Sequence, residues 1–240
     1  MTVHLVGAGP GHPDLLTVRA ARLLAAADVV VHDRLGTRHA LGLVPPDATL
    51  IDVGKAAGHA PVPQAAINKL LIDHGSTGAT VVRLKGGDPY VFGRGGEEAL
   101  ALAAAGVPFE VVPGVSAAFA APAAAGIPVT MRQRSLAVTV VTGHEDPSGC
   151  AEVDWEAHAA TGATLVLLMA TGRIERIAKR LMAGGLDPAT PVAAIHAGWT
   201  PEQHVVRTTL DAIGHARVQP PATIVIGSVA GLDLRAADGP

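Results

Sequence analysis

Short runs of β-branched residues alternate along the whole chain with alanine- and leucine-rich stretches of helical length. This alternation is typical of an α/β fold, in which helices cover a largely parallel sheet. In the first half, Thr17 is the expected N-cap of the first helix. We expect strands at residues 3–6, 29–31, 50–53, 80–84 and 109–112, and helices at residues 17–27, 64–73 and 97–105.

After Pro113 and Gly114, a second series of elements begins. Two of its strands lie next to each other in sequence around residues 199–203, which indicates a hairpin, so the second sheet should be mixed. We expect helices at 116–125 and 174–183 and strands at 137–142, 164–169, 192–196, 205–209 and 223–226. The chain should therefore form two α/β lobes, residues 1–113 and 114–240, with a ligand cleft between them.

Composition excludes several classes of protein. The chain has a formal net charge of −3 and only 2% aromatic residues, so it lacks the basic field and the stacking side chains typical of nucleic-acid binding. The single cysteine, Cys150, excludes an internal disulfide and a multi-cysteine metal site. His144 is followed by two acidic residues, but no helical pair of histidines accompanies it, so no metal site is expected.

One stretch has the length of a membrane span, because residues 111–131 carry no charge. Three prolines and two glycines within it favour a turn, a helix and a second turn. The N-terminus shows neither a basic region nor a cleavage site, so no secretory signal is expected. The sequence therefore predicts a cytoplasmic protein without a membrane partner.

A glycine-rich turn, Gly7-Ala8-Gly9-Pro10-Gly11, follows the first expected strand. It departs from the dinucleotide fingerprint because His12 stands where the third glycine is required. This departure disfavours an NAD-dependent oxidoreductase. Two interpretations of the turn remain open. Its glycines let a ligand approach the main chain, which we favour, or the turn is purely structural.

The segment KGGDPYVFGRGGEE, residues 85–98, follows the expected strand 80–84. In an open parallel sheet this is the carboxyl end of a strand, where ligands bind. Basic residues of this segment and of other candidate loops would surround one site, an arrangement that suits a small molecule with several carboxylates. These residues are Arg34, Lys55, Lys85, Arg94, Arg132 and Arg134.

Six segments, taken together, resemble the tetrapyrrole methylase family over roughly residues 3–230. They are VGAGPGHPDLLT (6–17), VVVHDRL (29–35), GKAAGHAPVPQAAIN (54–68), RLKGGDPYVFGRGGEE (83–98), VPGVSAAFAAPAAAGIPVT (112–130) and GWTPEQ (198–203). The resemblance implies a bilobal α/β fold that holds S-adenosylmethionine between its lobes, no metal, and a homodimer. Within the family, the segments at 54–68, with GK followed by VPQ, and at 83–98, with FGRGGEE, resemble those members that methylate uroporphyrinogen III at two pyrrole carbons to give precorrin-2.

The resemblance also implies site residues by position. Met169 ends an apolar strand and, by residue type alone, is expected in the core. The resemblance implies instead that it contacts S-adenosylmethionine, the methyl donor. S-adenosylmethionine contacts are expected at Pro10, Gly86, Gly87, Asp88, Val91, Ser116, Ala117, Met169, Gly198 and Gly227. Contacts to the tetrapyrrole are expected at Asp33, Arg34, Lys55 and Arg132. His32 and Met131 stand where the family usually has tyrosine and histidine.

The implied chemistry needs orientation above all, because the sulfonium is already an activated methyl donor. Attack by a pyrrole carbon leaves a cationic ring that must lose a proton from a bridging carbon, so a base is useful. Glu97 is the natural candidate for that base. The resemblance places Arg94 at the reaction centre, where we expect it to clamp a carboxylate and take part in proton removal. Two alternatives stay open: a methylase of another precorrin, and a non-catalytic binding module.

Overall fold

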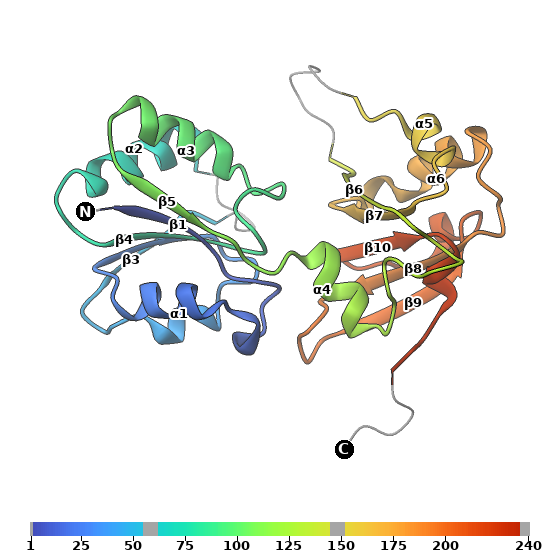
Figure 1. Cartoon of the computed structure of the whole chain (residues 1–240), viewed down its shortest axis with the longest axis horizontal. Coiled ribbons are helices and arrows are strands. Elements are labelled where there is room, and N and C mark those ends of the chain that lie inside the picture. Colours follow the sequence, from blue (N-terminus) through green and yellow to red (C-terminus); the bar gives the residue numbers. More distant parts are fainter. Residues whose placement is uncertain (1, 55–61, 145–151, 236–240) are drawn as a thin grey trace. The chain divides into compact units, whose positions relative to one another are not determined.

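The computed structural model describes residues 2–54, 62–144 and 152–235 (Figure 1). The chain divides into two compact units, Met1–Ser116 and Ala117–Pro240. The boundary between these units lies three residues beyond the one expected from the sequence.

The first unit is built on a five-stranded sheet in the order β3-β2-β4-β1-β5. Its strands are β1 (Val3–Gly7), β2 (Val29–His32), β3 (Thr49–Asp52), β4 (Val81–Lys85) and β5 (Phe109–Val112). Every neighbouring pair is parallel. The loops that follow all five strands therefore emerge at one edge of the sheet, which we call the carboxyl edge.

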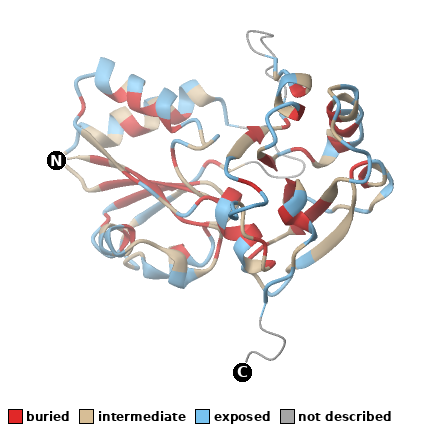
Figure 2. Ribbon diagram, turned by 45° about the vertical axis from the view of Figure 1, so that its right-hand side comes forward, coloured by how far each residue is buried: buried red, intermediate tan, exposed pale blue. Residues whose placement is uncertain are grey.

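Helices cover both faces of this sheet, with α2 (Gln64–Gly75) and α3 (Gly95–Ala104) on one face and α1 (Val18–Ala25) on the other (Figure 1). Leu71 of α2 and Leu102 of α3 pack against one face, and Leu24 of α1 packs against the other. The expected N-cap is confirmed, because the Thr17 hydroxyl accepts a hydrogen bond from the amide of Ala20 at 3.1 Å. Figure 2 shows the buried strands inside these layers.

The second unit is built on a sheet in the order β6-β7-β10-β8-β9. Its strands are β6 (Val138–Thr142), β7 (Thr164–Leu168), β8 (Pro191–His196), β9 (His204–Thr209) and β10 (Ala222–Ile226). Only β6 and β7 pair in parallel, and the other three pairs are antiparallel. The predicted mixed sheet and the predicted hairpin, β8–β9, are confirmed.

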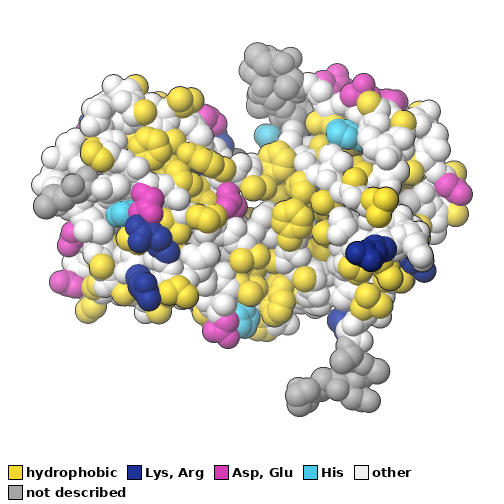
Figure 3. Space-filling model, in the orientation of Figure 1, with side chains coloured by type: hydrophobic (Ala, Val, Ile, Leu, Met, Phe, Trp, Pro, Cys, Tyr) yellow, Lys and Arg dark blue, Asp and Glu magenta, His cyan; other side chains and the backbone are white. Residues whose placement is uncertain are grey.

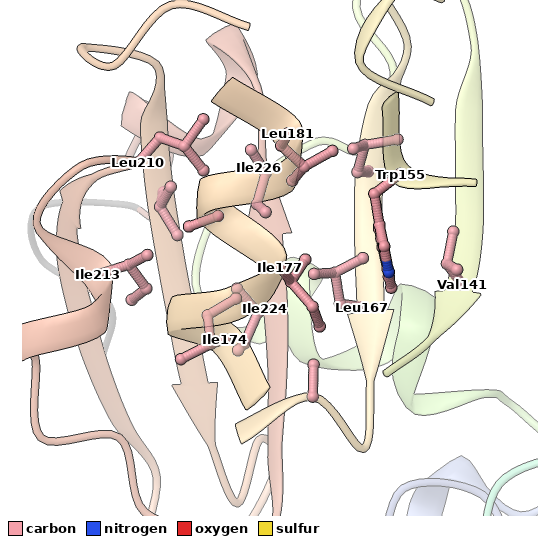
Figure 4. Packing of buried hydrophobic residues seen from close by; sticks show 14 of the residues in the cluster. Val141, Trp155, Leu167, Ile174, Ile177, Leu181, Leu210, Ile213, Ile224 and Ile226 are labelled. Carbon is pink, nitrogen blue, oxygen red and sulfur yellow. The ribbon is translucent and has the colours of Figure 1, made fainter. Parts of the chain in front are cut away.

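Helix α6 (Ile174–Ala183) packs on one face of this second sheet, and α4 (Ala117–Ala124) packs on the other. Figure 4 shows Ile174 and Ile177 of α6 facing the strand residue Ile224. A short helix, α5 (Trp155–Ala159), lies beside α6, and the sequence did not predict it. Within the described ranges, no helix is long and apolar enough to cross a bilayer.

Candidate functional site

Most of the predicted site residues of the first unit lie at its carboxyl edge. Pro10 follows β1, Asp33 and Arg34 follow β2, and Ser116 follows β5. Gly86, Gly87, Asp88 and Val91 all belong to the loop that follows β4. The parallel sheet therefore brings these loops together. Lys55 and Cys150 lie outside the described residues.

The glycines at this edge let three loops touch through their main chains. A Cβ atom placed on Gly114 would lie 2.1 Å from the carbonyl oxygen of Gly87, and one on Gly7 would lie 2.5 Å from the same oxygen. Gly9 and Gly87 also exchange main-chain hydrogen bonds of 3.2 and 2.8 Å. Gly9 and Gly87 use these main-chain groups on each other, and the approach of a ligand to the rest of the turn stays a prediction.

Asp88 joins two of these loops. Its Oδ1 accepts a hydrogen bond from the Tyr90 amide at 2.8 Å, and its Oδ2 accepts one from the Gly114 amide at 3.1 Å. The carboxylate thus fixes the loop after β4 against the loop after β5. Any group that binds at this turn meets a main chain that Asp88 has already ordered.

Arg94 and Glu97 form an exposed ion pair at the start of α3. The Nε and Nη2 atoms of Arg94 donate to the two carboxylate oxygens of Glu97 at 2.8 and 2.7 Å. The hydrogen bond from Arg94 lowers the pKa of Glu97. A carboxylate held in this way is a weak proton acceptor. The geometry therefore argues against Glu97 as the base while the pair is intact.

Lys85 was expected among the cations that surround the site, but it is buried. Its side chain is 3% exposed, and its Nζ donates to Glu98 Oε1 at 3.0 Å. Burial lowers the pKa of Lys85, and the positive charge of Arg83 lowers it further. Lys85 is therefore unavailable to a substrate carboxylate, because it already has a buried partner.

The other predicted cations remain near solvent. Arg34 is exposed, and its Nε donates to Asp52 at 2.7 Å. Arg132 and Arg134 are exposed in a tight turn of the second unit, which Met131 and Ser135 close with two main-chain hydrogen bonds of 2.9 Å. Both regions can therefore present guanidinium groups to an anion.

The two residues that depart from the family pattern have different surroundings. His32 is buried at the end of β2, and its Nδ1 lies 2.9 Å from the carbonyl oxygen of Asp33. Met131 is exposed. His32 therefore bears on the conformation of the β2 loop, whereas Met131 adds apolar surface beside Arg132.

In the second unit, three predicted donor contacts share one edge of the sheet, which we call the Met169 edge. Met169 follows β7 and Gly198 follows β8, and the carbonyl of Ala117 accepts a hydrogen bond from Thr223 of β10 at 3.4 Å. Met169 is 53% exposed. Its assignment to the core on base rates is therefore wrong.

Gly227 lies at the opposite edge of the same sheet. It follows Ile226, which pairs with Leu165 near the start of β7, whereas Met169 follows Leu168 at the end of β7. Strands rise about 3.4 Å per residue, so the two edges are roughly 14 Å apart. Gly227 therefore lies at a different edge of the sheet from Met169 and Gly198. The β10 residue at the Met169 edge is Ala222, which pairs with His196.

The segment GWTPEQ stabilises the end of α4, a role that sequence reasoning missed. Trp199 Nε1 donates to the Ala120 carbonyl at 2.7 Å, and Gln203 Nε2 donates to the Ala124 carbonyl at 3.1 Å. The last carbonyls of a helix have no partners within the helix. Gln203 therefore satisfies the last carbonyl of α4, and Trp199 adds a bond one turn earlier, beside Ala121, against which Gly198 packs.

Left-handed backbone conformations gather in the same loops. Phe92 and Arg94 have φ values of 53° and 59°, and Met169 and Trp199 have values of 55° and 66°. Non-glycine residues adopt this conformation rarely, and such strain clusters at functional sites. Sequence composition gives no signal for it, because none of these four residues is typical of the left-handed region.

Apolar side chains are exposed at the carboxyl edge, and sequence reasoning missed them. Leu35, Tyr90, Phe92 and Val115 follow β2, β4 and β5 and remain exposed. Figure 3 shows hydrophobic side chains gathered on the surface of the first unit. An apolar surface beside arginines suits a ligand that combines a flat ring system with charged arms.

Taken together, these features define an α/β protein with a small-molecule site at strand ends. Within the described residues, no group of histidine, cysteine, aspartate and glutamate side chains could hold a metal ion. Glycine turns, an arginine clamp and exposed apolar residues instead supply the recognition chemistry.

The chain belongs to the tetrapyrrole (corrin/porphyrin) methylase family, whose sequence profile matches residues 2–214. It is 48% identical to an S-adenosyl-L-methionine-dependent uroporphyrinogen III methyltransferase of Methanosarcina barkeri, over 95% of this chain and 91% of that protein. It is also 47% identical to a sirohaem synthase of Edwardsiella ictaluri, over 97% of this chain but only 50% of that protein. The chain thus spans about half the length of such sirohaem synthases.

Solved structures agree with the predicted fold class. The uroporphyrin-III C-methyltransferase of Thermus thermophilus, solved in complex with S-adenosylhomocysteine, superposes with a TM-score of 0.84 at 42% identity, covering 95% of this chain and 98% of that one. A cobalt precorrin-4 methyltransferase superposes with a TM-score of 0.86 at 28% identity, covering 96% of each chain. The expected bilobal tetrapyrrole methylase fold is confirmed.

Proposed function

We propose that this protein transfers two methyl groups from S-adenosylmethionine to pyrrole carbons of uroporphyrinogen III, giving precorrin-2. The likeness to the Methanosarcina barkeri methyltransferase over nearly the full length of both chains carries this proposal. The carboxyl edge supports it, because it combines ordered glycine turns, arginines and exposed apolar side chains.

Donor contacts are proposed for each unit separately. In the first unit they are Pro10, Gly86, Gly87, Asp88, Val91 and Ser116, which lie in the loops after β1, β4 and β5. In the second unit they are Ala117, Met169 and Gly198, which lie at the Met169 edge. We do not retain Gly227, because it lies at the other edge of that sheet.

In each transfer, the bond between sulfur and the methyl carbon breaks, and its electron pair stays on sulfur. A pyrrole carbon supplies the pair for the new carbon–carbon bond, which leaves a cationic ring. Loss of a proton from the bridging carbon to solvent water then restores a neutral ring. Alignment of donor and acceptor is the main contribution of the protein, and orientation lowers such barriers by about 7–11 kcal/mol.

Two charged groups at the carboxyl edge have roles in this reaction. Arg94 clamps a carboxylate arm of the substrate through the Nη1 and Nη2 hydrogens that Glu97 does not use, and Glu97 orients that guanidinium before the substrate arrives. Asp33 accepts a hydrogen bond from a pyrrole N–H and so stabilises the cationic ring. Arg83 binds Asp33 Oδ1 at 2.6 Å, whereas Lys85 Nζ lies 4.0 Å from Oδ2, beyond hydrogen-bond distance, so Oδ2 is the oxygen we assign to this contact.

Incubation of the protein with S-adenosylmethionine and uroporphyrinogen III, under anaerobic conditions, tests the function. We expect two molecules of S-adenosylhomocysteine and one dimethylated product, identified by mass and by its absorption spectrum. A later precursor that already carries methyl groups is the control acceptor. Methylation of that precursor alone would favour the family's other acceptors and overturn the proposal.

Asp88→Ala should weaken the binding of S-adenosylmethionine by about thirtyfold, because the carboxylate makes two hydrogen bonds that order the turn and together contribute about 2 kcal/mol. Calorimetric titration measures this affinity. Asp73→Ala is the matched control, since Asp73 is exposed on α2 and pairs only with Lys69 among the described residues. Wild-type affinity in Asp88→Ala would remove Asp88 from the donor site.

The homodimer and the cytoplasmic location remain predictions. The assay above works on the purified chain whatever its oligomeric state. Light scattering coupled to size-exclusion chromatography measures that state directly, and we expect twice the mass of a single chain.

A further inference from the structure

A fully buried carboxylate, Glu98, lies beneath the carboxyl edge in the first turn of α3. Its side chain is 0% exposed, and its Oε1 accepts hydrogen bonds from Arg83 Nε at 3.0 Å, Lys85 Nζ at 3.0 Å and Gln64 Nε2 at 3.3 Å. Its Oε2 is also buried and has no partner among the described residues. Neither the methyl transfer nor the donor contacts described above use this group.

Asp33 connects this cluster to the site. Arg83 Nη2 donates to Asp33 Oδ1 at 2.6 Å, and Lys85 Nζ lies 4.0 Å from Asp33 Oδ2. The Asp33 side chain is 32% exposed, whereas Arg83 and Lys85 are buried. Of the four charged groups, Asp33 is therefore the one through which the cluster reaches the carboxyl edge.

Arg83 is held firmly between the two carboxylates. Besides Glu98 and Asp33, its Nη1 donates to the carbonyls of Val31 and Leu84 at 3.4 and 3.3 Å. A planar guanidinium with this many partners has little freedom to turn. The position of Asp33 Oδ1 therefore depends on Arg83, whose Nε depends on Glu98.

The charges of the cluster balance, with Arg83 and Lys85 opposite Glu98 and Asp33. Burying such pairs is expensive, and apolar replacements are often equally stable, so the cluster is weak evidence for a role in stability alone. If Glu98 were neutral, two buried cations would face the single carboxylate of Asp33. That carboxylate would then be a poorer acceptor for a substrate N–H.

We propose that Glu98 is a positioning residue for methyl transfer, which acts through Arg83 and Lys85 to hold Asp33 in place and to balance its charge. The inference rests on the proposed function, because it assumes that Asp33 contacts the reacting pyrrole. Glu98 itself touches neither substrate. Other charged groups near the cluster are Arg94 and Glu97 at the start of α3, and His32, whose Nδ1 faces the Asp33 carbonyl.

The first test compares the pH dependence of kcat in two variants that change the charge of the cluster in opposite directions. Glu98→Gln removes a negative charge, so the acidic limb of the profile, where kcat falls at low pH, should move to lower pH. The maximal kcat should fall about tenfold, a typical coupling between contacting residues. Lys85→Met removes a positive charge, so the acidic limb should move to higher pH. The KM for S-adenosylmethionine should stay unchanged in both.

A purely structural role for Glu98 predicts a different outcome. It would lower stability in both variants and leave the acidic limb where it is, or move it in the same direction in both. Either result would overturn the proposal. Glu110→Gln is the matched control, because Glu110 lies in another ion cluster, with His4 and Arg19, and should leave the limb in place.

A second test needs no substrate and so separates this inference from the proposed function. The chain has only four lysines, so the side-chain carbon next to Nζ can be isotope-labelled and followed by NMR. The Lys85 signal is the one that disappears in Lys85→Met. The negative charges of Glu98 and Asp33 raise the pKa of Lys85 against the stronger effect of burial. Glu98→Gln and Asp33→Asn should therefore each move the Lys85 titration to lower pH.

The two tests distinguish their failures. An unchanged Lys85 titration in Asp33→Asn would show that the cluster does not couple to Asp33, and the inference would fall even if the enzyme were active. A wild-type protein that does not methylate uroporphyrinogen III would instead refute the proposed function. If Glu98→Gln does not fold, Asp33→Asn and Lys85→Met still decide the question.

Discussion

Arg94→Ala should lower the rate of methyl transfer about a thousandfold while the affinity for S-adenosylmethionine stays close to that of the wild type. The reason is that Glu97 holds the Nε and Nη2 atoms of Arg94 at 2.8 and 2.7 Å and so orients the remaining N–H groups of the guanidinium for two hydrogen bonds to a substrate carboxylate. Two hydrogen bonds to a charged partner contribute about 4 kcal/mol together, which corresponds to roughly a thousandfold in rate. Steady-state assays with both substrates measure the effect, and calorimetry measures the donor affinity.

Arg94→Lys is the informative companion to this variant. Lysine keeps the charge but not the planar fork, so its activity should lie between those of the wild type and Arg94→Ala. Glu97→Gln should also be less damaging than Arg94→Ala, because Glu97 only orients the guanidinium. Wild-type turnover by Arg94→Ala would remove Arg94 from the reaction centre.

Gly114→Ala should destabilise the first unit by about 3 kcal/mol and abolish the binding of S-adenosylmethionine. Its Cβ would lie 2.1 Å from the Gly87 carbonyl oxygen and 2.8 Å from the Gly7 Cα. Both neighbours are main-chain atoms, so no side chain can rotate away, and overpacking of this kind typically costs about 1–3 kcal/mol. The shift would also break the hydrogen bond from the Gly114 amide to Asp88. Urea denaturation measures the loss of stability.

Gly96→Ala is the matched control for this substitution. Gly96 lies in α3, and a Cβ placed there meets nothing within 4 Å. Alanine is the better helix former by up to about 1 kcal/mol, so this variant should be as stable as the wild type or slightly more so. Equal stability of Gly114→Ala and Gly96→Ala would contradict the close packing of the three loops.

The sequence predicted most strands to within one or two residues, because alternation between β-branched runs and helical stretches is a local property. The strand at 109–112 and the helix at 174–183 have the predicted bounds. The hairpin between β8 and β9 was also visible, since only a short turn separates the strands. Helix α5 was missed, because five residues are too few to show a helical period.

The candidate site was less visible, because its main features depend on contacts between distant segments. Gly7, Gly87 and Gly114 touch only after three parallel strands are placed side by side. Lys85 was expected among the cations around a ligand, because the sequence does not show that Glu98, on the next helix, is its buried partner. The misplacement of Gly227 has a related cause. In a mixed sheet, the order of strands along the chain does not say which edge each strand ends at.

A crystal structure with S-adenosylhomocysteine examines the donor site without intermediaries. In the first unit, the ligand should contact the turn formed by Gly86, Gly87 and Asp88. In the second, it should contact the loops that carry Met169 and Gly198. Electron density for the ligand beside Gly227, or anywhere away from the Gly86–Asp88 turn, would contradict our assignment.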